Sequence, residues 1–178
     1  MARIDHLAFR VRDRQKTVRF LCETLGYHLQ QEFPIYFNDE KTEFAMCSAL
    51  EPPEKVANGM PWVTLVPGDP PMEYHIPPEI FISEGSPGTI VDEWVKKHGP
   101  GLHHIAIQVD SVAETMEEWK SKGWAEFTSD VPLHCEGLTQ VFTKPSELTG
   151  VIFEFIERGT YGFCKENVKA LMESTKGN

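Results

Sequence analysis

One short apolar segment occurs twice in this chain, and both copies carry a histidine at the same position. The copies are IDHLAFRV at Ile4–Val11 and LHHIAIQV at Leu102–Val109. Each copy is followed by a helical pattern and then by a glycine and an aromatic residue. This indicates one structural unit that is written twice. The equivalent pairs are His6 and His104, Ala8 and Ala106, Val11 and Val109, Gly26 and Gly123, and Tyr27 and Trp124.

The repeated histidine points to a shared metal site. A strand shows alternate side chains to opposite faces, so His6 and His104 on paired strands would face one cavity. Imidazole is a common ligand of first-row transition metals, and two histidines with one carboxylate form the facial triad of non-heme iron enzymes. The repeat therefore raises the question of which acid completes the triad.

Glu154 is the candidate for that acid. It stands alone in the apolar run GVIFEFIE at 150–157, where a charge is costly to bury unless it is paired or binds a metal. The first unit offers no equivalent acid, because matching Glu84 to Glu157 puts Phe81 where Glu154 stands. Two histidines and one carboxylate leave up to three coordination positions open, which is unlike a closed structural site.

The composition is that of an ordinary globular protein. The 178 residues are 40% hydrophobic and 25% charged, and the net charge is −10. An acidic chain with no basic run argues against nucleic acid or an anionic membrane as the partner, so we expect a small-molecule ligand. We find no signal-peptide pattern and no apolar run of about 20 residues, and therefore expect a cytoplasmic protein.

The four cysteines show no metal or disulfide pattern. They lie far apart without C-x-x-C spacing, so we predict that they are reduced and mostly serve as packing residues. They are Cys22, Cys47, Cys135 and Cys164.

The hydrophobic periodicity predicts an α+β fold. In the first helix, Val18, Leu21, Cys22 and Leu25 follow the spacing of one packed face. The proline-rich segment Pro67–Pro78 is predicted to be a loop. The expected strands are residues 3–11, 27–33, 42–50, 62–66, 79–84, 101–109, 125–128, 138–144 and 151–157, and the expected helices are 14–25, 89–98, 112–122 and 165–174.

We interpret this order as two tandem βαβββ modules that form one curved sheet around a metal cavity, followed by a C-terminal helix. The chain 1–178 is then a single domain. Module one spans about 1–88, module two about 99–160, and the C-terminal helix about 163–175.

Four motifs in the same order resemble a known family. The chain resembles the vicinal oxygen chelate superfamily, and is most similar to the catalytic half of 4-hydroxyphenylpyruvate dioxygenase. Its GPGLHHIA, TQVFTKP and FEFIER segments are similar to family motifs, as is GFCKENVKALMES near the C-terminus. These segments are 99–106, 139–145, 153–158 and 162–174.

The resemblance implies a set of roles for individual residues. His6, His104 and Glu154 would bind Fe(II), or another divalent metal. Gln140 would be a catalytic residue that orients the ring end of the substrate. Ser83 takes the place of a family asparagine in substrate recognition, Phe142 would form an aromatic wall, and Phe163 would belong to a helix that covers the pocket.

The implied activity is oxidative decarboxylation of a 2-oxo acid with dioxygen, with the metal supplying the difficult chemistry. The resemblance covers nearly all of this chain but only half of the full-length enzyme. Val168 and His103 depart from the motifs, replacing a phenylalanine and a glutamine. Two-repeat relatives commonly pair, so a homodimer is expected.

Two other functions remain open. One is a metal-dependent epimerase, isomerase or lyase of the same superfamily, resembling methylmalonyl-CoA epimerase or glyoxalase. Such enzymes take a further Glu or Gln from the first repeat as ligand and base. The choice between the two activities therefore depends on whether Glu79 or Glu84 reaches the metal. The predicted register turns Glu84 away and puts Glu79 at the strand's start, but a slip of one residue would reverse this. The other is a metal-free module that sequesters a small ligand.

Overall fold

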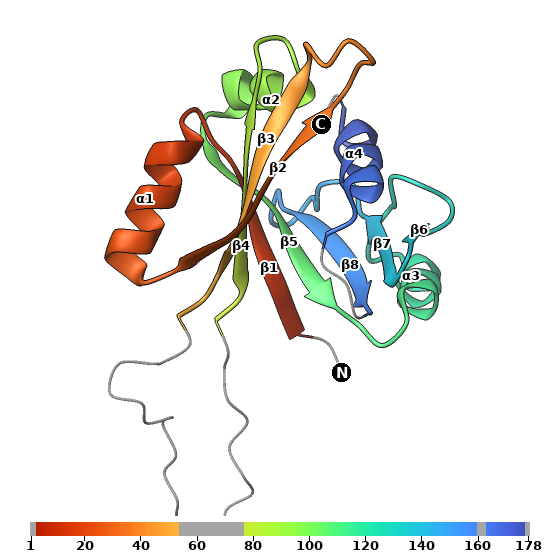
Figure 1. The fold of residues 1–178 in the computed structure, drawn as a ribbon. Helices are drawn as coiled ribbons and strands as arrows, with labels where there is room; N and C mark the ends of the chain where they lie inside the picture. Colours follow the sequence, from red (N-terminus) through yellow and green to blue (C-terminus); the bar gives the residue numbers. More distant parts are fainter. Residues whose placement is uncertain (1–2, 54–76, 160–162, 177–178) are drawn as a thin grey trace, which may run out of the picture.

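The computed structural model describes residues 3–53, 77–159 and 163–176 (Figure 1). The expected strand Trp62–Val66, nearly all of the expected loop Pro67–Pro78, and Gly162 of the last motif lie outside these residues. Within the described part of the chain, no helix is long and apolar enough to cross a membrane.

The elements follow the predicted repeat. The first module consists of β1, α1, β2, β3 and β4, and the second of β5, α3, β6, β7 and β8. Helix α2 connects the modules, and α4 follows the second. The bounds are β1 Arg3–Arg10, α1 Arg14–Leu25, β2 His28–Tyr36, β3 Phe44–Glu51, β4 Glu79–Gly85, α2 Ile90–His98, β5 Gly101–Gln108, α3 Val112–Ser121, β6 Leu133–Cys135, β7 Leu138–Phe142, β8 Ile152–Arg158 and α4 Lys165–Ser174.

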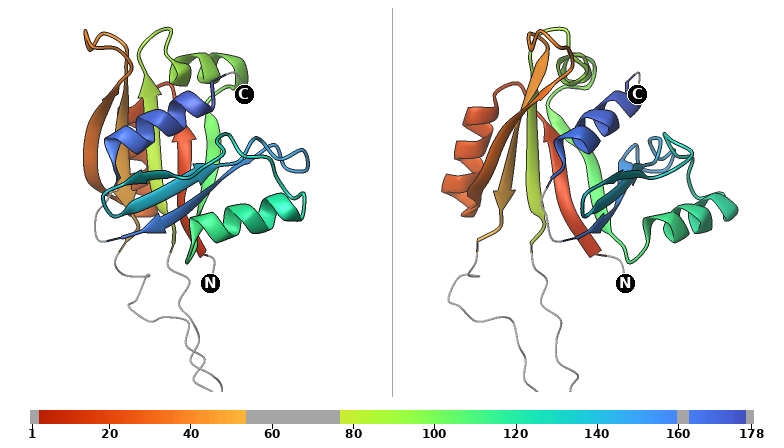
Figure 2. Two further views of the ribbon diagram at one scale, coloured as in Figure 1. Left: turned by 90° about the vertical axis from the view of Figure 1, so that its right-hand side faces the viewer. Right: turned by 45° about the vertical axis from the view of Figure 1, so that its right-hand side comes forward.

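All eight strands belong to one sheet of order β2-β3-β4-β1-β5-β8-β7-β6. Strands β1 and β5 pair antiparallel at its centre, and each pairs parallel with the last strand of its own module. Each half therefore repeats the same order outward from the centre. Figure 2 shows the sheet curving around α4, while α1 and α3 lie outside the curve. The α+β class and the two βαβββ modules are confirmed.

The register also confirms the expected equivalence of Phe81 and Glu154. Phe81 pairs with Ala8, and Glu154 pairs with Ala106, which is the counterpart of Ala8. The acids three residues further on are also equivalent. A carboxylate oxygen of Glu84 accepts a hydrogen bond from the first backbone N–H of α1, and Glu157 does the same for α3, so both satisfy a free donor at a helix start.

Two predictions of packing and pairing are wrong. In α1, Val18, Leu21 and Cys22 pack against the core, but Leu25 is 57% exposed because it is the last residue of the helix, where Gly26 turns the chain away. The expected strand at 125–128 forms only one bridge, between Phe127 and Thr143. The strand that pairs with β7 is β6 instead, because Glu136-Gly137 makes a tight hairpin with a left-handed Gly137.

The prediction of four reduced cysteines is also wrong. Cys135 and Cys164 form a disulfide with a Cα–Cα separation of 6.4 Å, while Cys22 and Cys47 are free. Sequence spacing could not reveal the pair, because the two cysteines are 29 positions apart and two strands of the second module lie between them. The β6–β7 hairpin and the end of β8 bring the two thiols together. The bond joins β6 to Cys164, the residue that begins α4.

Candidate metal centre

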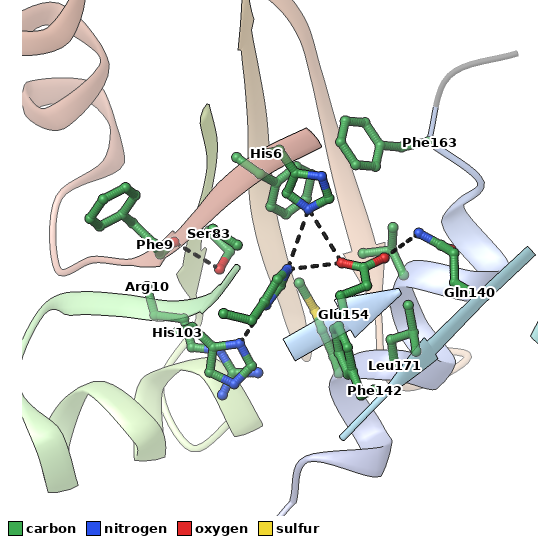
Figure 3. A pocket seen from close by; sticks show the side chains of 15 residues that line it. His6, Phe9, Arg10, Ser83, His103, Gln140, Phe142, Glu154, Phe163 and Leu171 are labelled. Atoms are coloured by element: carbon green, nitrogen blue, oxygen red, sulfur yellow. Dashed lines mark hydrogen bonds and ion pairs between the residues drawn. The ribbon is translucent and has the colours of Figure 1, made fainter. Parts of the chain in front are cut away.

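Three side chains meet at the middle of the concave face, as the sequence predicted. His6 lies on β1, His104 on β5 and Glu154 on β8, and one ligand atom of each lies within 4.8 Å of the other two. The His6 and His104 Nε2 atoms are 3.4 Å apart, and they lie 3.3 and 3.1 Å from the Oε2 atom of Glu154. All three side chains are buried. Figure 3 shows His6 and Glu154 pointing toward one another.

These separations fit one metal ion. A first-row ion lies about 2.1 Å from its nitrogen and oxygen ligands, so neighbouring ligands are roughly 3.0 Å apart at right angles and roughly 3.4 Å apart in a tetrahedron. Two neutral imidazoles and one carboxylate also form the donor set that such ions bind. The three residues therefore have the chemistry and the spacing of a single facial metal site.

Two bulges aim the residues that precede the histidines. The pairing of β1 with β5 skips Asp5 and His103, so each of these side chains shares the concave side with the histidine that follows it. The His6 Nδ1 atom lies 2.8 Å from Asp5 Oδ1, and the His104 Nδ1 atom lies 2.8 Å from His103 Nδ1. Both Nε2 atoms are thereby turned toward Glu154. Such partners fix the ring orientation of metal-binding histidines.

Asp5 is itself held in place by Arg158. Arg158 donates to both of its carboxylate oxygens at 2.7 Å and to Glu79 at 3.1 Å. Burial alone would raise the pKa of Asp5, but the bonds with His6 and Arg158 hold it below its usual range. Burial alone would lower the pKa of His6, yet the hydrogen bonds to Asp5 and Glu154 raise it to about 9. Without metal, His6 is therefore an imidazolium at neutral pH.

His104 has the opposite character. Burial lowers its pKa, and the bond to Glu154 only partly offsets this effect. His103 is held well below its usual pKa by burial and by the positive charge of Arg10. The two equivalent histidines thus differ in charge because a carboxylate supports one and a neutral imidazole the other.

Glu154 has a partner on each oxygen. Its Oε2 atom faces the two histidines, and its Oε1 atom accepts a hydrogen bond of 2.5 Å from Gln140 Nε2. Burial alone would raise its pKa, but the hydrogen bonds with His104 and His6 lower it to about 2. The carboxylate is therefore ionised, as a metal ligand must be. The Gln140 Oε1 atom is buried and has no hydrogen-bond partner in the described part of the chain.

The predicted substrate contacts line the same cavity. Ser83, Gln140, Phe142 and Phe163 all border it together with the triad. The Phe163 ring lies 5.2 Å from the His6 ring and 4.9 Å from the Phe81 ring. The cavity holds only about 30 Å³ of free space, room for one or two water molecules. Val168, Leu171 and Met172 of α4 also line it.

The family model that describes the glyoxalase, bleomycin resistance protein and dioxygenase superfamily matches residues 5–142, more than half of the chain. The chain belongs to this superfamily. The match covers β1 to β7 and thus both predicted histidine ligands.

Curated relatives of the chain are named as an epimerase and a lyase. The chain is 23% identical over 154 residues to mitochondrial methylmalonyl-CoA epimerase of Mus musculus, covering 86% of this chain and 72% of the relative. It is 29% identical over 157 residues to a probable chloroplastic lactoylglutathione lyase of Arabidopsis thaliana, covering 88% of this chain and 36% of the relative.

Solved structures of superfamily proteins share the fold. A mutant of 4-hydroxymandelate synthase from Streptomyces coelicolor matches with a TM-score of 0.71 at 18% identity, covering 98% of this chain and 53% of the synthase. This chain therefore spans about half of that synthase chain. A methylmalonyl-CoA epimerase matches with a TM-score of 0.63 at 22% identity, covering 88% of this chain and 95% of the epimerase.

The acids that could distinguish superfamily activities do not line the cavity in this member. Glu84 binds the start of α1, and Glu79, the register partner of His6, pairs with Arg158. Phe81 occupies the position equivalent to Glu154 and turns its ring toward His6 and Phe163. Among the cavity-lining residues that the structure describes, Glu154 is the only carboxylate.

Sequence reasoning missed three residues of this site. Asp5 and Arg158 support His6, and Arg10 lines the cavity next to Ser83. The signal for Asp5 was its position directly before the first repeated histidine, which is equivalent to the position of His103 in the second repeat. For Arg10 the signal was strand alternation. His6, Ala8 and Arg10 are each two residues apart, so their side chains face the same side of the strand, and Arg10 is a charged residue on that side.

Proposed function

We propose that this protein is a metal-dependent dioxygenase that acts on a 2-oxo acid, with Fe(II) as the metal at His6, His104 and Glu154. The observation that carries the proposal is the pair of equivalent positions Phe81 and Glu154. With a carboxylate at one and a phenyl ring at the other, three of the described residues would be protein ligands for one ion. The ion would then keep open positions for a chelating 2-oxo acid and dioxygen.

The protein groups have separate tasks in this proposal. Bound Fe(II) would supply the redox chemistry with dioxygen that decarboxylates the 2-oxo acid. Asp5 and Arg158 would hold His6 as a ligand, and the deprotonation of His6 would accompany metal binding. Phe81, Phe142 and Phe163 would exclude water. Gln140 would keep Glu154 oriented through its amide N–H, while its free Oε1 atom is able to accept a hydrogen bond from a substrate hydroxyl.

An epimerase or lyase of the same superfamily is the second candidate, favoured by the names of the relatives. Such a reaction removes a proton next to a carbonyl and needs a base beside the metal. The described part of the cavity offers only Glu154, which would be a ligand, and the neutral His103. Glu79 would have to leave Arg158 to act as that base, since the two are paired at 3.1 Å. This cost makes the epimerase the weaker proposal.

The deciding experiment is anaerobic reconstitution with Fe(II), followed by 4-hydroxyphenylpyruvate and other 2-oxo acids, and then by air. We expect a visible charge-transfer band with a bound 2-oxo acid, then oxygen uptake and release of carbon dioxide. The matched control is Glu154→Ala, which should lose metal binding, the band and oxygen uptake while keeping the fold by circular dichroism.

Three results would contradict the dioxygenase. Metal binding with no band for any 2-oxo acid would do so, and solvent-deuterium exchange into methylmalonyl-CoA would then favour the epimerase. A protein that binds no divalent metal would favour a ligand-sequestering module. Normal metal binding by Glu154→Ala would reject the proposed ligand set itself.

A further inference from the structure

Arg10 is a buried cation on the same face of β1 as His6. Its side chain borders the metal cavity, and only 2% of the residue is exposed. It lies four residues after His6, which places the two Cα atoms roughly 13 Å apart along the strand. In Figure 3, Arg10 and His103 lie on one side of Glu154, whereas Gln140 and Phe163 lie on the other. A buried cation therefore stands on the side of the cavity away from Gln140 and Phe163.

Two other arginines in the described structure, the buried Arg14 and the half-buried Arg158, have acidic partners, and Arg10 does not. Arg14 pairs with Glu32, and Arg158 pairs with Asp5 and Glu79. The Arg10 Nη2 atom donates to the Thr175 hydroxyl at 3.1 Å, and the guanidinium lies over the Trp94 ring at 5.6 Å. Its Nη1 atom is buried and has no hydrogen-bond partner among the described residues. A buried charge without a counter-charge is costly, so a ligand that supplied one would be rewarded.

Two further polar residues line the cavity with Arg10. Ser83 is the register partner of Arg10 on the neighbouring strand β4, and its hydroxyl donates to the Phe9 carbonyl oxygen at 3.4 Å. His103 contacts the same Trp94 ring, and its buried Nε2 atom has no hydrogen-bond partner among the described residues. On the other side, Arg10 pairs with Gly101, which has no side chain to fill the space. Burial lowers the pKa of Arg10 to about 9, which leaves it charged at neutral pH.

We propose that Arg10, Ser83 and His103 form a subsite for a carboxylate at the end of the substrate that lies away from the metal ligands. The substrate class is then a 2-oxo dicarboxylic acid, whose 2-oxo acid end would face the triad and whose second carboxylate would pair with Arg10. This inference rests on the proposed function for the first end of the substrate. The carboxylate would accept from the free Nη1 atom, and a guanidinium binds such a group through paired donors.

The position of Thr175 adds a link to α4. Thr175 ends this helix, and its hydroxyl accepts the hydrogen bond from Arg10 Nη2, so the guanidinium is tied to the end of α4. Arg10 borders the outer cleft between α2 and α4 as well, whose charged lining includes Lys97 and Lys176 and also Glu43, Glu93 and Glu173.

The test compares acids of equal length that differ only in the second carboxylate. The Fe(II)-loaded protein is titrated anaerobically with 2-oxoadipate and 2-oxohexanoate, and with 2-oxoglutarate and 2-oxopentanoate, by calorimetry and by the visible band. We expect each dicarboxylate to bind roughly 10- to 100-fold more tightly than its partner, the range for charge-assisted hydrogen bonds. Arg10→Met should remove this preference, Arg10→Lys should keep part of it, and the surface control Lys97→Gln should keep it fully.

A second readout needs no metal. Adipate should raise the melting temperature of the metal-free wild type but not that of Arg10→Met. If the neutral-ended acids give the band and bind as tightly as the dicarboxylates, the subsite is wrong and the dioxygenase survives. If adipate stabilises in an Arg10-dependent way but no 2-oxo acid gives a band, the subsite survives and the dioxygenase fails. Should Arg10→Met not fold, the preference of the wild type decides alone.

Discussion

At the scale of single residues, the two halves of the site differ where their backbones agree. Equivalent bulges present Asp5 beside His6 and His103 beside His104. The first repeat has Asp5 where the second has His103, and this difference makes His6 a stronger base than His104. A second difference, Phe81 opposite Glu154, determines how many protein ligands the ion would have. Chemistry in this fold is therefore set by the positions at which the repeats diverge.

Phe81→Gln tests the three-ligand site directly. The amide oxygen would provide a fourth ligand from β4, so we expect tighter binding of divalent metal and loss of most of the 2-oxo acid band. The lost packing should cost about 3 kcal/mol of the free energy of unfolding. Competition titrations with a chelating dye and visible spectra measure the two effects.

Phe81→Leu is the matched control because it removes the ring without adding a ligand. It should keep the metal affinity and the band, at a smaller cost in stability. If the leucine and glutamine variants bind metal and 2-oxo acid alike, position 81 has no influence on coordination.

At the scale of elements, α4 is tied to the sheet at both ends. The disulfide between Cys135 and Cys164 holds its start to β6, and the Thr175–Arg10 hydrogen bond holds its end to β1. Between them, Val168, Leu171 and Met172 line the cavity. None of the three predicted metal ligands lies on α4. The helix therefore forms part of the cavity wall without supplying a ligand.

Cys164→Ser should release the start of α4. Closing a loop of 29 residues contributes about 3 to 4 kcal/mol to the free energy of unfolding in the chain-entropy model, so a loss of that size is expected. Urea unfolding with and without reductant measures it, and metal affinity should stay unchanged. Cys22→Ser is the control, since Cys22 is free. Equal stability of the wild type in both redox conditions would contradict a stabilising bond.

At the scale of the whole molecule, the buried cluster makes stability depend on pH. His6 has a folded pKa of about 9 against an ordinary 6.5, so its contribution is present below pH 6.5 and is lost as the pH rises through 9. The lowered pKa values of His103 and His104 act in the other direction, because their unfolded forms take up protons below pH 6.5. Glu154 adds a loss as the pH falls from 4.5 toward 2.

In the metal-free protein, we therefore expect the cluster to contribute most to the free energy of unfolding near pH 6.5. Metal binding must remove the His6 proton, so the metal affinity should rise with pH between 6.5 and 9, and the metal should stabilise most at the alkaline end. Melting temperatures across pH 4 to 9.5, with and without Co(II) as a stable substitute for Fe(II), measure both trends. A pH-independent stabilisation by metal would contradict an imidazolium at His6.

Much of this molecule follows from local sequence. The repeated histidine segment, the alternation of strands and the helical spacing predicted two βαβββ modules, and α1 and α4 have the predicted bounds. The lone acid in an apolar strand singled out Glu154, and the repeat alignment placed Phe81 opposite it. These inferences succeeded because strand and helix periods are local and because one repeat calibrates the other. The metal and substrate roles of these residues stay predictions.

Other features depended on contacts between distant segments. The disulfide, the β6 hairpin, the support of Asp5 by Arg158 and the unpaired charge of Arg10 join or separate residues by amounts that no local pattern encodes. A one-residue bulge in each of β1 and β5 put Asp5 and His103 on the concave face, against the simple alternation of a strand. The sequence alone determined which side chains are available and on which strands they lie. Only the tertiary structure decided which charges find a partner, because burial and pairing are properties of the packed sheet.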